Sequence, residues 1–424
     1  MNILWITNIE FPEATQLITG SGELKATGGW LLGASKALLN GKRNINLTVA
    51  TVSSRVKQLT RLEGQEITYY MIPYGKGNLH KNKEYIPYWK RINIEVAPDV
   101  VHIHGTEFSH GLAYVDACGA DNVVVSIQGM KSAYYYYYYY GVTKWEILKN
   151  ITIRDIFRGS PLKGQRLFKK QSEYEIELLQ KVKHIIGRTS WDRARTWAIN
   201  PDAKYHFCNE TLRDEFYNGD KWSHDTCKSH SIFVSQAGYP IKGVHQLLKA
   251  MPFILREYPD TTIRVAGFDI TRNGGIWGLK HFTTYGRIVR KMICRYNLVG
   301  KVEFLGNLNA VQMKSEYLHC NVFVSPSSIE NSPNSVGEAQ ILGTPIIASY
   351  VGGVADMMKS NEVGLYRFEE TEMLAYKICE IFKGSNPQMD MSLIANQRHS
   401  PKKNQEDLLA IYESVYNNSN IMKK

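Results

Sequence analysis

Short β-branched runs alternate with helical patterns along the chain. Continuous apolar runs of this kind are typical of parallel strands buried on both faces, and their alternation with helices indicates repeated βα units. The sequence therefore predicts an α/β fold. The expected strands lie at 3–8, 47–52, 100–104, 123–127 and 184–188 in the first half, and at 232–236, 262–267, 302–305, 322–325 and 345–349 in the second.

A polar, irregular stretch at 218–230 separates the two sets of expected strands. Stretches of this composition commonly link domains. The length of 424 residues allows two domains, each large enough to bury its own core. We expect one Rossmann-like domain over 1–222 and a second over 223–403, with the helical segment near 404–424 packing back on the first.

The composition is that of an ordinary globular protein, with 21% charged and 43% hydrophobic residues. The chain opens with a strand-like segment rather than a signal peptide, and no run approaches the roughly 20 apolar residues of a membrane-spanning helix. The six cysteines are scattered and form no Cys-x-x-Cys pair, which favours reduced thiols and a cytoplasmic protein. The net charge of +11 favours anionic partners.

Residues Tyr134 to Tyr140 are seven consecutive tyrosines, and a basic stretch follows them. Between Lys131 and Lys170 the chain carries nine Lys or Arg residues against two acidic ones. Aromatic and cationic side chains together favour a membrane interface, so one interpretation is contact with the inner face of the cell membrane through 131–170. The alternative is a solvated helical excursion that contains a low-complexity run.

Residues 325–339 join the end of an expected strand to the start of a helix. Ser332 suits the N-cap, Pro333 the first helical position and Gly343 the end of this helix. The backbone N–H groups of Asn334 and Ser335 would then face the carboxyl end of the sheet, where doubly wound folds bind ligands. A helix N-terminus at that edge predicts an anion site.

Two glutamates and a lysine surround this predicted anion site. Glu338 lies one turn into the helix, where it could hold the ribose of a nucleotide, and Glu330 precedes the helix, within reach of a sugar. Lys242 follows another strand of the same edge and suits a phosphate, while Leu308 lies in a third loop that could contact a base. Each residue alone also has a structural explanation, since acids near helix starts satisfy the dipole and loop lysines are solvated.

The order of these elements resembles family 4 of the retaining glycosyltransferases, within the group 1 glycosyltransferases. The matching elements are Lys242-Gly243, Gly306, Ser-Pro-Ser at 325–327, Glu330 and Glu338 in their spacing, Gly343, Pro345 and Gly352-Gly353. The resemblance implies the GT-B fold, in which two Rossmann-like domains face each other across a deep interdomain cleft. It covers 231–353 well and the first half weakly.

The resemblance also implies roles for individual residues. In that family the acid matching Glu338 holds the donor ribose, the acid matching Glu330 contacts the transferred sugar, and the lysine matching Lys242 binds the diphosphate. Glu330 and Lys242 are therefore the expected catalytic residues. The expected donor-binding residues are Glu338, Asn334, Ser335, Leu308 and the pair Gly28-Gly29, which matches a loop that meets the donor phosphate.

Three residues near strand ends of the first half are candidates for the acceptor or sugar pocket, namely His104, Gln128 and Arg188. The segment 209–213 could also shape this pocket. His104 could instead be a packed core residue, and Arg188 could serve structural ion pairing.

Two positions depart from the family pattern. Family members usually carry an arginine where this chain has Ala237, so neutralisation of the diphosphate would rest on Lys242, the helix N–H groups and Arg188. Many members carry a histidine where this chain has Gln128, which can hydrogen-bond a sugar hydroxyl but cannot shuttle a proton. In the front-face retaining mechanism the departing diphosphate itself takes the acceptor proton, so that histidine is helpful but not indispensable.

These observations predict a retaining, metal-independent hexosyltransferase that moves a sugar from a UDP- or GDP-sugar to a glycan or lipid-linked saccharide in surface polysaccharide biosynthesis. No cofactor is expected besides this co-substrate, since the chain has no Asp-x-Asp motif and no zinc spacing. One alternative is a sugar-nucleotide epimerase or hydrolase of the same fold. Another is a non-enzymatic protein that binds anions or nucleic acid, although nucleic acid is not expected because no recognised motif is present.

Overall fold

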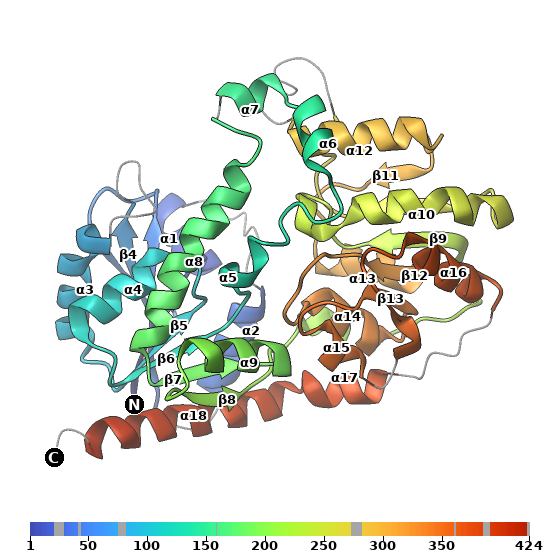
Figure 1. Cartoon of the computed structure of the whole chain (residues 1–424). Coiled ribbons are helices and arrows are strands. Elements are labelled where there is room, and N and C mark those ends of the chain that lie inside the picture. Colours follow the sequence, from blue (N-terminus) through green and yellow to red (C-terminus); the bar gives the residue numbers. More distant parts are fainter. Residues whose placement is uncertain are drawn as a thin grey trace. The chain divides into compact units, whose positions relative to one another are not determined.

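The computed structural model describes residues 1–20, 29–40, 44–74, 82–157, 159–272, 282–359, 362–384 and 391–421. The chain forms two compact units, each with its own sheet (Figure 1). Unit 1 comprises Met1–Ser132, Lys169–Arg213 and His399–Lys424, and unit 2 comprises Ala133–Phe168 and Asp214–Arg398.

The described part of unit 1 contains an eight-stranded sheet in the order β3-β4-β2-β1-β5-β6-β7-β8. All neighbouring strands are parallel except β3 and β4, which form an antiparallel edge pair. The strands are β1 (Asn2–Thr7), β2 (Asn46–Ser53), β3 (Thr60–Glu63), β4 (Ile67–Pro73), β5 (Val100–His104), β6 (Val123–Ser126), β7 (His184–Gly187) and β8 (Lys204–Phe207).

The described part of unit 2 contains a six-stranded, fully parallel sheet in the order β11-β10-β9-β12-β13-β14. Its strands are β9 (Lys228–Val234), β10 (Thr262–Val265), β11 (Val302–Phe304), β12 (Cys320–Ser325), β13 (Ile346–Ser349) and β14 (Leu365–Tyr366).

Helices cover both faces of each sheet, as buried parallel strands require. In chain order they are α1 (Pro12–Thr19), α2 (Gly29–Asn40), α3 (Asn82–Val96), α4 (Ser109–Cys118), α5 (Lys131–Tyr134), α6 (Lys144–Lys149), α7 (Ile153–Phe157), α8 (Lys163–Lys181), α9 (Ser190–Ile199), α10 (Val244–Glu257), α12 (Thr284–Arg295), α13 (Ala310–His319), α14 (Asn334–Leu342), α15 (Val354–Met358), α16 (Thr371–Phe382), α17 (Ser392–Arg398) and α18 (Pro401–Ile421).

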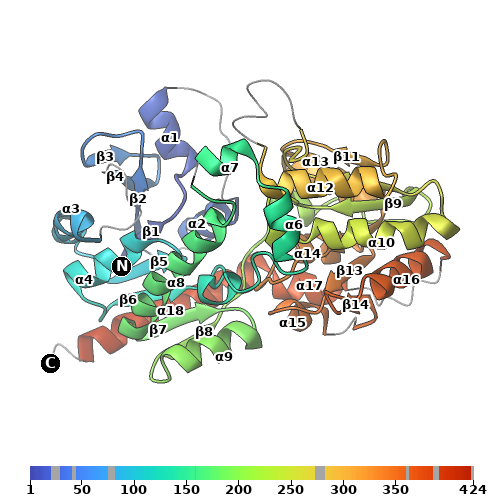
Figure 2. The ribbon, with the colours of Figure 1, turned by 45° about the horizontal axis from the view of Figure 1, so that its top comes forward.

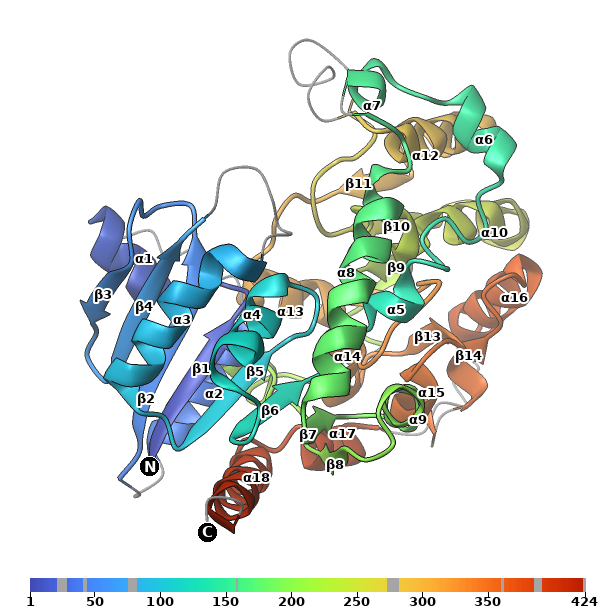
Figure 3. The same cartoon turned by 60° about the vertical axis from the view of Figure 1, so that its left-hand side comes forward.

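In unit 1, α3 and α4 pack on one face of the sheet, and α2 and α18 pack on the other (Figure 3). The side chains of successive β5 residues point to opposite faces of the sheet. Ile103 packs against Gly111 of α4 on one face. On the other face, Nδ1 of His102 lies 2.7 Å from the hydroxyl of Tyr412 in α18. The indole Nε1 of Trp5 donates to the same hydroxyl at 2.9 Å. The last helix of the chain therefore belongs to the core of unit 1.

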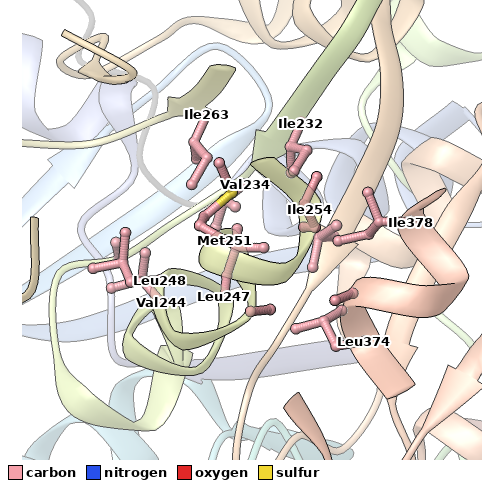
Figure 4. Close-up of a cluster of buried hydrophobic side chains, with 14 of the residues drawn as sticks. Ile232, Val234, Val244, Leu247, Leu248, Met251, Ile254, Ile263, Leu374 and Ile378 are labelled. Atoms are coloured by element: carbon pink, nitrogen blue, oxygen red, sulfur yellow. The ribbon is translucent and has the colours of Figure 1, made fainter. Parts of the chain in front are cut away.

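In unit 2, α10 and α16 cover one face of the sheet. Figure 4 shows the apolar cluster that they bury, in which Val244, Leu247 and Met251 of α10 lie against strand residues. The opposite face packs aromatic rings, with Tyr317 of α13 at 5.1 Å from Phe233. Both faces of β9 and β12 are thus buried, which explains their continuous apolar runs.

All ten predicted strands are present. The prediction missed four strands, namely β3, β4, β8 and β14. Strand β3 carries alternating exposed residues, β8 has exposed residues at both ends, and β14 has only two residues, so none of the three gives a continuous apolar run. Strand β4 is largely buried and is absent from the prediction.

The division into domains differs from the predicted one at 222/223. The stretch 218–230 is not a linker, because the indole Nε1 of Trp222 donates to the carbonyl of Cys320 at 2.7 Å and its backbone N–H to the carbonyl of Leu342 at 2.8 Å. Strand β9 then begins at Lys228. The contacts place the boundary between Arg213 and Asp214 instead.

The tyrosine-rich segment 133–168 also belongs to unit 2, although it lies within the predicted first domain. The carbonyl of Tyr140 lies 3.0 Å from Nε2 of His245, and the ammonium group of Lys249 donates to the carbonyl of Gly141 at 2.7 Å. Tyr139 and Val142 pack on the apolar cluster of unit 2. The segment is therefore a docked insertion and not a solvated excursion.

We expect Tyr412→Phe to destabilise the protein. The substitution deprives two buried groups, Trp5 Nε1 and His102 Nδ1, of their shared partner, at a cost of about 1–3 kcal/mol for each. Urea unfolding of the full chain measures this cost. Tyr416→Phe on the same helix, where the side chain is partly exposed, is the control and should change stability by less than about 0.5 kcal/mol. Equal effects of the two substitutions would contradict the assignment.

Candidate active site

An ion pair joins two loops at the carboxyl end of the unit 2 sheet. Lys242 follows β9 and Glu330 follows β12, and these strands are neighbours in the sheet. The ammonium group of Lys242 lies 2.6 Å from Oε1 of Glu330, and Ser327 donates its hydroxyl to the same oxygen at 2.9 Å. The side chains of Lys242 and Glu330 are only 18% and 11% exposed. The structure thus brings together the two predicted catalytic residues.

The surroundings keep Lys242 charged. Burial alone would lower the pKa of Lys242, but the carboxylate of Glu330 and the hydroxyl of Tyr239 outweigh it and raise this pKa above its usual value. The ammonium group also lies 5.8 Å from the ring centre of Tyr239. A charged lysine at this strand edge is suited to a phosphate.

Two glycines allow the loops to approach this closely. Gly243 adopts φ 68°, and a Cβ there would lie 1.7 Å from the carbonyl oxygen of Pro326. Gly352 adopts φ 53°, and a Cβ there would lie 1.9 Å from the carbonyl oxygen of Glu330, which accepts from the N–H of Gly353 at 3.0 Å. A side chain at either glycine would push Glu330 or its loop away.

Helix α14 begins beside this pair. The structure places the N-cap at Pro333 rather than at the predicted Ser332, whose hydroxyl instead lies 3.7 Å from the sulfur of Met357. Asn334 and Ser335 form the first turn and are half-buried, and the helix ends at Gly343 with φ 77°, as predicted.

Glu338 lies one turn into α14 and is 5% exposed. Its Oε2 accepts from the hydroxyl of Tyr317 at 3.3 Å. Glu338 therefore links α14 to Tyr317 of α13.

Among the described residues, the other predicted donor-binding residues lie in a loop of unit 2 and at a helix start of unit 1. Leu308 is half-buried in the loop between β11 and α13. Gly29 opens α2 of unit 1, whereas Gly28 lies outside the described residues. Ala237, at the position of the family arginine, is 2% exposed and packs in the apolar cluster of unit 2.

A cavity opens in unit 1 at the carboxyl ends of β5, β6, β7 and β8. Its cavity volume is about 60 Å³. His104, Gln128 and Arg188, the three predicted acceptor residues, all line it. Its apolar walls come from α2 and α18, through residues such as Leu38 and Leu408.

The charge of Arg188 is already compensated inside unit 1. Its Nη1 lies 2.6 Å from Oε2 of Glu210, and its Nη2 donates to the carbonyl of Ile127. The side chains of Arg188 and Glu210 are 5% and 13% exposed. Arg188 thus serves an internal pair in unit 1, and its assistance in neutralising a diphosphate stays a prediction.

The two histidines of β5 are neutral. The rings of His102 and His104 are tilted by 30° with centroids 3.7 Å apart. Burial lowers the pKa of His102 to about 3, and burial together with the charge of His102 lowers the pKa of His104 well below its usual value. The hydroxyl of Tyr412 accepts from Nε1 of Trp5 and lies 2.7 Å from Nδ1 of His102.

Two amides of the cavity wall have atoms that lack a hydrogen-bond partner among the described residues, namely Oδ1 of Asn209 and Nδ2 of Asn404. Asn404 is 6% exposed and comes from α18. No sequence signal marks Asn404, since a single asparagine near the start of a distant helix has no motif around it. Asn209 lies in the predicted segment 209–213.

Across the described residues, no group of three or more His, Cys, Asp or Glu side chains is arranged to hold a metal ion. In the same part of the chain, no helix combines the length and the apolar character needed to cross a membrane.

Residues 220–400 match the protein family described as Glycosyl transferases group 1. This range contains the ion pair, the glycine loops and α14. This match covers less than half of the chain. The uncharacterized glycosyltransferase YqgM of Bacillus subtilis is 25% identical over 187 residues, which are 43% of this chain and 48% of YqgM. The chain thus matches about half the length of this relative.

Two solved structures resemble this chain over nearly its whole length. HepE of Anabaena, in complex with UDP and glucose, has 14% identity and a TM-score of 0.65 and covers 98% of this chain and 100% of its own. Sucrose-phosphate synthase of Thermosynechococcus elongatus has 15% identity and a TM-score of 0.63 and covers 99% of this chain and 98% of its own. The predicted GT-B class, with two Rossmann-like domains, is confirmed.

The neutral histidines predict a loss of stability in acid. Because the pKa of His102 is about 3 in the folded state and about 6.5 in an unfolded chain, only the unfolded state takes up this proton between these values. Stability therefore falls as pH falls, by about 1.4 kcal/mol per pH unit for each such histidine. His102→Gln should reduce the slope by about this amount between roughly pH 6 and pH 5, measured by urea unfolding.

The wild type and His102→Gln share the same carboxylates, so the contribution of these groups to the pH dependence of stability cancels when the two slopes are compared. A pH slope that His102→Gln leaves unchanged would contradict the neutral assignment, whatever the substitution costs at neutral pH.

Proposed function

We propose that this protein is a retaining, metal-independent glycosyltransferase that uses a UDP- or GDP-sugar as donor. The observation that carries the proposal is the buried pair of Lys242 and Glu330 at the carboxyl edge of a group 1 glycosyl transferase sheet. The acceptor is a glycan or a lipid-linked saccharide, and the pathway is surface polysaccharide biosynthesis. The resemblance to HepE with UDP and glucose favours UDP over GDP.

Lys242 and Glu330 exchange partners when the donor binds. The diphosphate attracts the ammonium group of Lys242, and hydroxyl groups of the donor sugar donate to the carboxylate of Glu330 that Lys242 releases. Without the family arginine at Ala237, Lys242 carries more of the charge neutralisation, together with the first turn of α14. A ribose hydroxyl would replace the hydroxyl of Tyr317 as a donor to Glu338.

The cavity of unit 1 suits an uncharged, hydroxyl-rich acceptor. Arg188 is paired with Glu210, and the histidines of β5 are neutral, so little net charge faces an acceptor. The amide atoms of Asn209 and Asn404 can accept from and donate to hydroxyl groups, and the apolar wall of α2 suits the face of a sugar ring.

The protein acts mainly through charge and position. The bond from the anomeric carbon to the diphosphate oxygen breaks while the acceptor oxygen attacks from the same face, and the departing diphosphate takes the acceptor proton. Lys242 stabilises the negative charge that develops on the diphosphate. A histidine with a strongly lowered pKa, such as His104, is too weak a base to compete for this proton.

We expect donor binding to stabilise the protein against heat by mass action. Melting temperature should rise with UDP or with GDP, and the rise should persist in EDTA because no metal bridges the diphosphate. Lys242→Met should abolish the rise. Lys291→Met, at an exposed lysine of the same unit, is the control. No shift with any nucleoside diphosphate or its sugars would contradict the donor assignment.

The two glutamates should differ in their kinetic effects. Glu330→Ala should lower kcat by about 10²-fold with a smaller change in KM, because Glu330 acts on the sugar during transfer, whereas Glu338→Ala should mainly raise the donor KM. Glu372→Ala, at an exposed glutamate of unit 2, is the control. Wild-type constants in both variants, or donor hydrolysis that no saccharide acceptor accelerates, would overturn the proposal. Retention is checked from the anomeric NMR signal of the product.

A further inference from the structure

Five large apolar side chains are exposed close together on the insertion of unit 2. Between 56% and 86% of each side chain is accessible, in Trp145, Leu148, Ile153, Ile156 and Phe157. Single exposed apolar residues are common on protein surfaces, but several within one short segment mark an interaction site. We call the surface that these five residues form, with Lys144 and Lys149, the α6–α7 face.

The segment that carries this face is firmly attached to unit 2. Asp155 is buried, and its Oδ2 accepts from both the backbone N–H and the hydroxyl of Thr284 at the start of α12, at 2.6 Å each. Arg287 of α12 donates to the carbonyl of Ile151 at 2.9 Å, and Ile147 is buried in the apolar cluster. Helix α6 accordingly lies beside α12 (Figure 2).

This attachment explains why the apolar residues point outward. Polar contacts and one buried isoleucine fix the helices, so the outer side chains are not needed for packing. The exposure is thus a stable property of the folded unit. Contact with an apolar partner would remove these side chains from water.

The exposed charged side chains of the α6–α7 face are positive. Glu146 is used in a capping box with Thr143, and Asp155 is paired with Arg154 at 2.9 Å and with Thr284. Lys144 and Lys149 are exposed, and the ammonium group of Lys149 lies 4.7 Å from the ring centre of Trp145. Apolar side chains with a flanking cation and tryptophan are complementary to the boundary between acyl chains and anionic headgroups.

We propose that the α6–α7 face docks on the surface of an anionic lipid bilayer, with Trp145, Ile156 and Phe157 inserted among the acyl chains. The lysines add electrostatic attraction to the anionic headgroups. Docking would bring the enzyme to a lipid-linked acceptor, but it does not depend on the proposed reaction.

Flotation with vesicles tests the docking. The full chain is mixed with vesicles of phosphatidylcholine alone and of phosphatidylcholine with phosphatidylglycerol. We expect binding to the anionic vesicles, and a loss of roughly ten-fold or more in the triple variant Trp145→Ser, Ile156→Ser, Phe157→Ser. The matched control is Val299→Ser, Val311→Ser, Tyr376→Ser, which removes three side chains of unit 2 that are 60–74% exposed. Equal loss in the two triple variants would overturn the proposal.

Charge variants separate lipid docking from other contacts. Lys144→Glu with Lys149→Glu should weaken flotation with anionic vesicles several-fold, and added salt should do the same, whereas Lys359→Glu with Lys402→Glu should have little effect. No flotation with any vesicle at low salt would overturn the proposal. So would a concentration-dependent dimer in gel filtration that the triple variant dissociates, since the face would then bind a second copy.

Measuring transferase activity with a soluble saccharide acceptor separates a failure of membrane docking from a failure of the proposed reaction. The triple variant should retain wild-type kcat with that acceptor while losing flotation. Loss of both would indicate damage to unit 2 and count against the docking role, and flotation without any transferase activity would count only against the reaction.

Discussion

The buried pair of Lys242 and Glu330 is the constraint on which the site of unit 2 depends. Two opposite charges removed from water are tolerated only while they remain close and hydrogen-bonded, and loss of one partner costs several kcal/mol. The residues are far apart in sequence but follow neighbouring strands of one sheet, so the sheet sets their separation. In the proposed reaction a ligand must satisfy both groups at once, because a diphosphate that takes the lysine leaves a carboxylate in need of donors.

The cavity of unit 1 has the opposite electrostatic character. Its arginine and glutamate cancel each other, and its neighbouring histidines are kept neutral by burial. Among the described residues of this wall, the charged side chains are paired with each other. The two units thus differ: unit 2 carries a buried lysine that is suited to an anion, whereas unit 1 offers a shaped cavity with uncharged hydrogen-bonding groups. Such a division suits a transfer in which the donor carries all of the formal charge.

The strongest sequence signals were those in which local physics dictates the residue. Continuous apolar runs located the buried strands, and Gly243 and Gly352 could be recognised because only glycine allows their loops to touch neighbouring backbone. The ion pair itself was not predicted as a contact, although both residues were singled out. Sequence could not reveal that Arg188 would be neutralised by Glu210 or that Asn404 would reach the cavity, because both depend on how distant segments pack.

The tyrosine run illustrates the same limit in a different way. Its composition indicates an unusual surface, yet the segment 133–168 that contains it is flanked in the chain by parts of unit 1 and belongs to unit 2. Hydrogen bonds from His245 and Lys249 to its backbone help to attach it there. Those bonds use carbonyl groups that every residue type possesses, and so they leave no trace in the sequence.

The chain passes from one unit to the other at Ser132, Phe168, Arg213 and Arg398. Neither unit is therefore a contiguous stretch of polypeptide. A fragment that stops at Arg213 would lack α18, and with it the hydroxyl that Trp5 and His102 share, while a fragment that starts at Asp214 would lack the backbone that His245 and Lys249 bind. Truncation at a single point would thus yield two incomplete cores. A folded half of this molecule has to be assembled by joining segments end to end in a new order, so that each core recovers its missing piece.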